Sequence, residues 1–181
     1  IKLIFMKVNK IFGINKKVKC VGLGTWGLGG KSYGPINKKK AEKILNKSIN
    51  LGVNFFDTSD LYSNVEKLIG NTIKCKKKII IATKCGLLPH TNWNMPEKFT
   101  LSHIKNSIIS SMRRLKTNHI DILQLHSPSK KVLYSKKFKR IINLLEEFRL
   151  KGKISIHGVS VRDPMDGIFL INNYKEIKVI Q

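Results

Sequence analysis

Several short apolar runs of this chain end in a side chain that can exchange a proton or carry a charge. These side chains are Asp57 and Tyr62 in the stretch 54–62, Lys84 after the run 79–83, His126 after the run 120–125, and Ser160 after the run 154–159. In a parallel barrel, the carboxyl ends of successive strands converge on one face, where the chemistry takes place. The sequence therefore predicts a single site that gathers these groups.

The residue types suit protonation of a carbonyl oxygen during hydride delivery. A tyrosine titrates near 10, and a neighbouring ammonium lowers that pKa toward the range of a useful proton donor. We therefore expect Lys84 to lower the pKa of Tyr62 and Asp57 to balance the lysine charge in a partly buried pocket. His126 would hydrogen-bond the substrate oxygen from the other side. Each residue alone has an ordinary structural explanation, but their shared position at strand ends favours an active site.

The composition describes one domain with a large basic excess. The chain has 181 residues, is 41% hydrophobic and carries a formal charge of +24. Such a charge suits nucleic-acid binding, but the lysines lie in every segment and no aromatic residues interleave with the clusters 38–40 and 76–78. Lysine, isoleucine and asparagine all have A/T-rich codons, so genome composition alone is enough to produce the excess. We predict no nucleic-acid partner, although a basic surface favours an anionic ligand such as a dinucleotide phosphate.

The sequence also predicts a cytoplasmic protein. No apolar run reaches the roughly 18 residues of a membrane span, and no secretory signal is recognisable. The three cysteines, Cys20, Cys75 and Cys85, lack the spacing of a disulfide framework or a zinc site. Cys85 follows Lys84, so it is either a somewhat activated thiol or a passive small residue. We expect no metal ion.

Strand and helix patterns alternate along the chain, which favours a parallel α/β sheet with crossover helices. A hairpin over 7–12 and 17–21 comes first. We then expect strands at 20–23, 53–56, 78–83, 119–125, 154–159 and 176–181, and helices at 38–51, 63–74, 102–115, 135–150 and 164–173. The segment 85–100, with Pro89, Trp93 and Pro96, reads as a long functional loop, and 127–131 as a shorter one.

The chain resembles the aldo-keto reductase family over essentially its whole length. The motifs that carry the resemblance are Gly-Leu-Gly-Thr-Trp at 22–26, Asn-Phe-Phe-Asp-Thr-Ser-Asp-Leu-Tyr at 54–62, Val-Glu-Lys-Leu-Ile-Gly at 65–70, Ala-Thr-Lys at 82–84, Met-Arg-Arg-Leu at 112–115, Ile-Asp-Ile-Leu-Gln-Leu-His at 120–126 and Gly-Val-Ser at 158–160. The resemblance implies a (β/α)8 TIM barrel. We expect residues 1–181 to form one such domain, truncated after about the sixth strand and incomplete at the carboxyl end.

The resemblance also implies a function and a set of site residues. It implies NADP(H)-linked reduction of an aldehyde or ketone, with NAD(H) not excluded. The implied catalytic residues are Asp57, Tyr62 as proton donor, Lys84 and His126, and the implied cofactor-binding residues are Gly24, Thr25, Trp26, Asp57, Ser160 and Gln181. Val161 stands where the family often has asparagine, so one contact to the nicotinamide carboxamide is expected to be missing.

Two alternatives stay open from the sequence. Some members of the family serve as channel subunits, so a non-catalytic binding or regulatory module on the same barrel is the first, and an inactive fragment is the second. The substrate, the oligomeric state and the activity of the 181 residues by themselves are not specified by the sequence.

Overall fold

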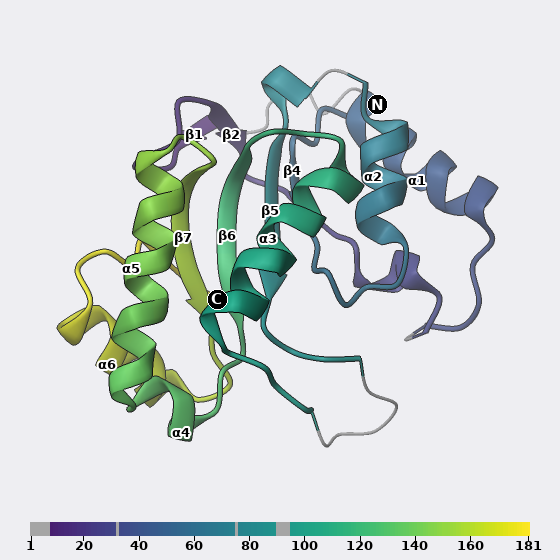
Figure 1. Cartoon of the computed structure of the whole chain (residues 1–181). Helices are drawn as coiled ribbons and strands as arrows, with labels where there is room; N and C mark the ends of the chain where they lie inside the picture. Colours follow the sequence, from purple (N-terminus) through teal and green to yellow (C-terminus); the bar gives the residue numbers. More distant parts are fainter. Residues whose placement is uncertain (1–7, 32, 75, 90–94) are drawn as a thin grey trace.

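The protein is organised around a curled parallel sheet with helices along its outer face (Figure 1). The structure, a computed structural model, describes residues 8–31, 33–74, 76–89 and 95–181. Cys75, Trp93 and Lys7, which figure in the sequence predictions, lie outside the described residues. Within the described part of the chain, no helix is long and apolar enough to cross a membrane.

The main sheet has six strands in the order β3-β4-β5-β6-β7-β8, and every pair is parallel. The strands are β3 (Leu23–Gly24), β4 (Phe55–Asp57), β5 (Ile80–Cys85), β6 (Ile120–His126), β7 (Ile154–Ser160) and β8 (Val179–Ile180). The sequential order and the crossover helices confirm the predicted fold, since this half-barrel corresponds to the first strands of a (β/α)8 barrel. The order also places the carboxyl ends of all six strands on the same side.

The connecting helices begin and end close to where the sequence predicts them. They are α1 (Lys38–Asn50), α2 (Val65–Thr72), α3 (Leu101–Leu115), α4 (Lys130–Leu133), α5 (Lys136–Leu150) and α6 (Pro164–Asn173), with 3-10 turns η1 (Trp26–Gly29) and η2 (Lys76–Lys78). The Asn37 side chain accepts a hydrogen bond from the Lys40 amide and so caps α1. Asp163 caps α6 in the same way through the Met165 amide, with Pro164 at the first helical position. One prediction needs correction, because the expected loop 127–131 contains the start of α4.

The hairpin closes the amino-terminal end of the sheet. Strands β1 (Val8–Lys10) and β2 (Lys17–Lys19) pair antiparallel as predicted, and the chain crosses the strand ends (Figure 1). The hairpin residues Ile14 and Val18 pack on inward-facing side chains of the sheet, which are Ile80, Ala82, Ile122 and Ile156. The Lys16 Nζ reaches Asp121 Oδ1 at 2.6 Å and anchors the hairpin to β6. The hairpin does not cover the opposite end of the sheet, where the strands end.

The outer layer packs through a larger apolar cluster between the sheet and the helices α1, α2, α3 and α5. Helices α2 and α3 approach closely at Gly70, where a Cβ atom would lie 2.2 Å from the Arg114 carbonyl oxygen. A buried carboxylate crosses the same boundary. Glu66 accepts hydrogen bonds from Thr83 Oγ1 and Arg114 Nε, both at 2.6 Å. These contacts fix α2, which follows directly after the loop that carries Tyr62.

Candidate active site

The loop after β4 is held by backbone hydrogen bonds to its neighbours. The Thr58 amide donates to the Ala82 carbonyl at 2.8 Å, and the Asp60 amide donates to the Lys84 carbonyl at 3.2 Å. On the other side, Thr25 donates through both its amide and its hydroxyl to the Asp57 carbonyl, at 2.9 and 2.8 Å. The carboxyl ends of β3, β4 and β5 therefore form one rigid unit.

Asp57 and Lys84 form a buried ion pair on this unit. Lys84 Nζ lies 2.5 Å from Asp57 Oδ1 and donates a second hydrogen bond to the Thr58 carbonyl at 3.1 Å. The lysine side chain is 3% exposed and that of Asp57 is 19% exposed. Burial lowers the pKa of Lys84 while the charge of Asp57 acts in the opposite direction. The predicted pairing of these two residues is thus present in the structure.

Tyr62 stands beside the pair, but the predicted effect on its pKa is wrong. Lys84 Nζ lies over the ring, 5.6 Å from its centroid. Burial, and then the negative charge of Asp57, raise the pKa of Tyr62 to about 12. The physical reason is that the ammonium is already neutralised by Asp57, so the phenol feels its burial and the carboxylate more than the lysine. Tyr62 is consequently a neutral phenol that carries its proton at physiological pH.

His126 faces Tyr62 from the end of β6. The two rings meet edge to face with centroids 6.2 Å apart, and the register of the sheet sets His126 beside Ser160. The His126 Nδ1 lies 3.0 Å from the Ser59 hydroxyl oxygen. The structure thus brings Asp57, Tyr62, Lys84 and His126 to one end of the sheet, as the strand-end pattern predicts.

Sequence reasoning missed a second acidic group in this region. Asp60 accepts a hydrogen bond from the Ser59 hydroxyl at 3.3 Å. Burial, followed by the nearby charge of Glu66, raises its pKa from 3.8 to about 7, and Arg114 acts in the opposite direction. Both Ser59 and Asp60 stand inside the motif 54–62, and the available signal was a second carboxylate three residues after Asp57.

Of the two alternatives for Cys85, an activated thiol and a passive small residue, the structure favours the passive residue. Its side chain is fully buried, and burial raises the pKa of the thiol well above its ordinary value. Nearby carboxylates, those of Asp60 and Glu66, act in the same direction. A neutral buried thiol is a poor nucleophile. Cys20, by contrast, is an exposed free thiol.

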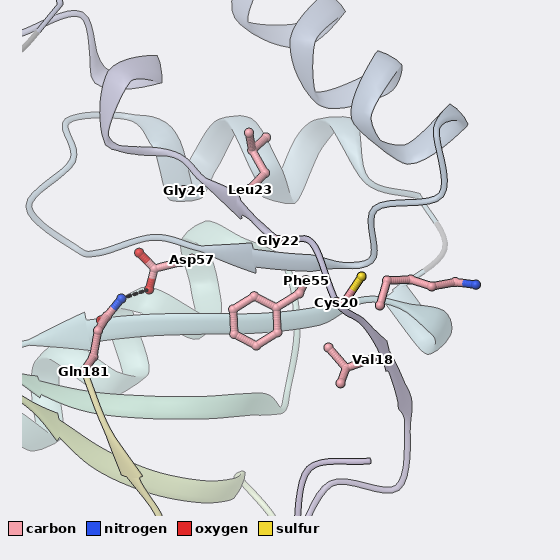
Figure 2. A pocket seen from close by; sticks show the side chains of 9 residues that line it. Val18, Cys20, Gly22, Leu23, Gly24, Phe55, Asp57 and Gln181 are labelled. Atoms are coloured by element: carbon pink, nitrogen blue, oxygen red, sulfur yellow. Dashed lines mark hydrogen bonds between the residues drawn. The ribbon is translucent and has the colours of Figure 1, made fainter. Parts of the chain in front are cut away.

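An open cleft lies along the inner face of the sheet between β3, β4 and β8 (Figure 2). Its volume is about 420 Å³. The residues that line it are Val18, Lys19, Cys20, Gly22, Leu23, Gly24, Phe55, Asp57 and Gln181. Asp57 and Gln181 point toward each other at one end of the cleft, with Gln181 Nε2 3.5 Å from Asp57 Oδ1 (Figure 2). A Cβ atom at Gly24 would meet nothing within 4 Å, so a ligand can reach the backbone there.

The remaining sequence-predicted binding residues occupy different positions. Thr25 is fully buried, so its side chain holds the loop and does not face a ligand. Trp26 is 51% exposed and meets Tyr33 edge to face, with ring centroids 5.6 Å apart. Ser160 lies at the end of β7 with its hydroxyl 3.1 Å from that of Ser127. The Val161 amide donates to the Gln181 carbonyl at 2.8 Å and joins the ends of β7 and β8.

A nicotinamide group fits the polar atoms at these strand ends. Gln124 is buried, and its side-chain oxygen has no hydrogen-bond partner among the described residues. Its amide nitrogen donates to Gln181 Oε1 at 3.2 Å. The Gln181 carboxamide therefore stands between a buried amide and the Asp57 carboxylate. A carboxamide ligand has the hydrogen-bond donors and acceptors that can pair with such groups.

A parallel half-barrel with its polar side chains gathered at the carboxyl ends of the strands has the architecture of a barrel enzyme. The profile of the aldo/keto reductase family matches residues 20–181, and the chain belongs to this family. Its members are oxidoreductases, and the sequence resemblance is therefore confirmed.

Individual relatives agree with this assignment. An uncharacterized oxidoreductase, YqkF of Bacillus subtilis, is 32% identical over 166 residues, which cover 86% of this chain and 49% of the relative. L-galactose dehydrogenase of Arabidopsis thaliana is 34% identical over 116 residues, covering 61% of this chain and 34% of that protein. Among solved structures, the aldo-keto reductase AKR11C1 from Bacillus halodurans in its holo form superposes with a TM-score of 0.81 at 27% identity, covering 97% of this chain and 57% of that one. The chain thus spans about half the length or less of the curated relatives described here.

Proposed function

We propose that this protein reduces an aldehyde or ketone to an alcohol with a reduced nicotinamide dinucleotide, NADP(H), without excluding NAD(H). The observation that carries the proposal is the convergence of a neutral phenol, a buried ammonium–carboxylate pair and an imidazole at one end of the sheet. Family membership supports the same class of reaction. The proposed substrate is a small carbonyl compound.

Tyr62 is the proposed proton donor. Its raised pKa keeps the phenol protonated at neutral pH, so the residue holds the proton that a carbonyl oxygen must receive. His126, whose ring meets that of Tyr62, hydrogen-bonds the same oxygen and orients it. Lys84 supplies positive charge next to the phenol as the proton leaves, and Asp57 keeps that ammonium charged in its buried position.

The cofactor residues are proposed from the cleft and from the strand ends. The bound cofactor supplies the hydride that the carbonyl carbon receives. Ser160 and Gln181 would hold the carboxamide of the nicotinamide, and the backbone at Gly24 is open to a ligand. Trp26, two residues after Gly24, offers an exposed aromatic surface to the cofactor. Thr25 and Asp57 contribute by fixing the wall of the cleft.

The test is the oxidation of NADPH by the protein on addition of a simple aldehyde, with Tyr62→Phe as the decisive variant. General acid catalysis contributes about 10²- to 10⁴-fold. Tyr62→Phe is therefore expected to lose roughly 99% or more of its carbonyl reduction while it still binds cofactor. Tyr174→Phe is the matched control, because the Tyr174 ring packs edge to face on Phe138 at 5.1 Å and is away from the strand-end groups. Turnover by Tyr62→Phe above about a tenth of the wild-type value would contradict the assigned donor.

The same experiment separates an enzyme from a binding module. A module that only binds cofactor would quench or enhance NADPH fluorescence but would not consume NADPH with any aldehyde. The proposal fails in that case, and the barrel would then serve recognition alone.

A further inference from the structure

A second pocket, which we call the basic pocket, lies at the amino-terminal end of the sheet, where the hairpin meets the starts of β4 and β5. Its volume is about 300 Å³. Of the seven described residues that line it, five are lysines and none is acidic. The lining residues are Asn15, Lys16, Lys17, Lys19, Asn54, Lys77 and Lys78.

Two segments far apart in the sequence supply these lysines. Lys17 and Lys19 on β2 alternate with Val18, whose side chain is buried against the inner face of the sheet. Successive side chains of a strand point to opposite faces, so the two lysines share the face that looks away from this core. Lys77 and Lys78 come from η2, and both are exposed. The pocket therefore gathers ammonium groups from both segments.

The side chain of Asn54 holds the two segments together. Its Nδ2 donates hydrogen bonds to the Lys17 carbonyl at 2.7 Å and to the Lys78 carbonyl at 3.1 Å. Its Oδ1 accepts a hydrogen bond from the Lys19 amide at 2.9 Å. All three contacts use backbone atoms of the lysines. The shape of the basic pocket is thus fixed without the ammonium groups.

One of the five lysines has its charge compensated. Lys16 Nζ lies 2.6 Å from Asp121 Oδ1 and donates to the Ile79 carbonyl at 2.7 Å. Within the described part of the chain, no acidic side chain forms an ion pair with the other four lining lysines. Lys10 also stands directly opposite Lys17 in the hairpin, and like charges in that position repel. An anion in the pocket would relieve this repulsion.

We propose that the basic pocket binds an oligophosphate, a small anion with two or more linked phosphate groups, through Lys17, Lys19, Lys77 and Lys78. Lysine ammonium groups bind phosphate oxygens through charge-assisted hydrogen bonds. A phosphate group carries about one to two negative charges, so four ammonium groups balance at least two phosphates. The volume is at the lower end of the range for small-molecule sites, which favours a small ligand over a nucleic-acid duplex.

This proposal is independent of the proposed reductase function. The basic pocket lies at the starts of β4 and β5, whereas Asp57 and Lys84 stand at or next to the carboxyl ends of the same strands. A genome rich in A and T accounts for the number of lysines. It does not account for a hollow that two lysine-bearing segments enclose without an acidic residue. Free inorganic oligophosphate and the phosphate chain of a nucleotide share the chemistry that this hollow recognises.

The test is calorimetric titration of the whole 181-residue chain with sodium tripolyphosphate at low salt. The pocket variant combines Lys17→Gln, Lys19→Gln, Lys77→Gln and Lys78→Gln. These changes keep the backbone contacts of Asn54, so the variant is expected to fold, which circular dichroism checks. If the combined variant does not fold, Lys77→Gln and Lys78→Gln are titrated singly.

The matched control removes the same amount of charge from another surface. It combines substitutions of four exposed lysines on α1, which are Lys39→Gln, Lys40→Gln, Lys43→Gln and Lys47→Gln. Both fourfold variants therefore have the same net charge. Any difference between them in ligand binding reports the position of the lysines and not their number.

The expected losses follow from the energy of exposed ion pairs. One such pair changes an equilibrium by up to about fivefold, so the pocket variant is expected to bind tripolyphosphate at least about tenfold more weakly than wild type. The single variants should each lose about two- to fivefold, and the control should stay within about twofold of wild type. Raising the salt from about 50 to about 500 mM should weaken wild-type binding, because exposed charges are screened.

Two further ligands define what the pocket recognises. Orthophosphate cannot span both segments, so it is expected to bind at least about tenfold more weakly than tripolyphosphate. ATP that binds as tightly as tripolyphosphate identifies the phosphate chain as the recognised group. ATP that binds more tightly, with the gain abolished in the pocket variant, identifies a nucleotide as the source of that chain. Both results support an oligophosphate site.

Three results would overturn the proposal. The first is a wild-type protein that does not bind tripolyphosphate at low salt. The second is an equal loss of binding in the pocket variant and in the control, which would mean that only total charge matters. The third is a short oligothymidylate that binds more tightly than tripolyphosphate and is weakened equally by both variants, which would identify a dispersed nucleic-acid surface. None of these readouts depends on carbonyl reduction.

Discussion

Replacing Asp60 with asparagine should reveal how strongly the fold opposes its charge. Asp60 has a pKa of about 7 in the folded protein against an ordinary value of 3.8, which we take for the unfolded chain. Between these two values the folded state binds the extra proton. Stability therefore falls as the pH rises through this window. Above the folded pKa, the contribution of the Asp60 proton to stability is fully lost. In Asp60→Asn the side chain has no titrating carboxyl group, so this loss of stability with rising pH is absent.

The size of the effect follows from the shift. One pKa unit corresponds to about 1.4 kcal/mol, so a change from 3.8 to about 7 corresponds to an upper limit of about 4 kcal/mol. Partial access of water to the side chain reduces this figure. We expect the free energy of unfolding of Asp60→Asn, relative to wild type, to increase by about 2–4 kcal/mol between about pH 4 and pH 8.

Urea unfolding of both proteins at several pH values measures this difference, because other titrating groups cancel in it. Asp163→Asn is a suitable control. Hydrogen bonds from Lys130 and from the Met165 amide lower the pKa of Asp163, so its contribution changes only below about pH 4. Its difference from wild type should stay flat over the same range. If the difference in unfolding free energy between Asp60→Asn and wild type is also flat, Asp60 ionises normally and its environment does not oppose its charge. A slope of opposite sign would mean that the carboxylate is stabilised.

Three further substitutions test the packing around the site. Lys84→Met breaks a buried ion pair and leaves the Asp57 charge unbalanced, which should cost about 3–5 kcal/mol of unfolding free energy and shift the pH profile of reduction as well as depress it. Arg114→Met leaves the Glu66 carboxylate, 1% exposed, without its cation and should cost a similar amount, as measured by urea unfolding. Gly70→Ala should destabilise the protein by about 1–3 kcal/mol despite the higher helix propensity of alanine, because its Cβ would meet a backbone oxygen at 2.2 Å.

Matched variants show whether these losses have the stated cause. Gly167→Ala, inside α6, places a Cβ 3.3 Å from a side-chain methyl of Ile180 and meets no backbone atom, so it should cost much less than Gly70→Ala. If Gly70→Ala is equally well tolerated, α2 and α3 are not in the close contact described. Asp57→Asn should affect reduction less than Lys84→Met, because the lysine side chain stays over the phenol ring and the change removes a carboxylate that raises the pKa of Tyr62. Equal effects without a change in the pH profile would identify a purely structural pair.

Much of the fold follows from local signals in the sequence. Hydrophobic periodicity, the Asn37 cap and the Asp163-Pro164 start act within a few residues, so the main helices appear close to where these patterns predict them. The alternation of strand and helix also determines the parallel order, and with it the shared edge on which Asp57, Lys84 and His126 lie. The short helix α4 was missed because four residues carry too little periodicity to distinguish them from a loop.

The electrostatics and the hydrogen-bond network required the tertiary structure. The raised pKa of Tyr62 depends on how deeply the ring is buried and on which of two opposite charges dominates, and neither is a local property. The contact between Ser59 and His126 joins residues 67 positions apart, and the burial of Asp60 requires helices α2 and α3 to pack against the loop. The sequence determines which groups stand at the strand ends, because strand direction is set by local pattern and short connections. Only packing decides how much water reaches each group and which neighbour shares its proton.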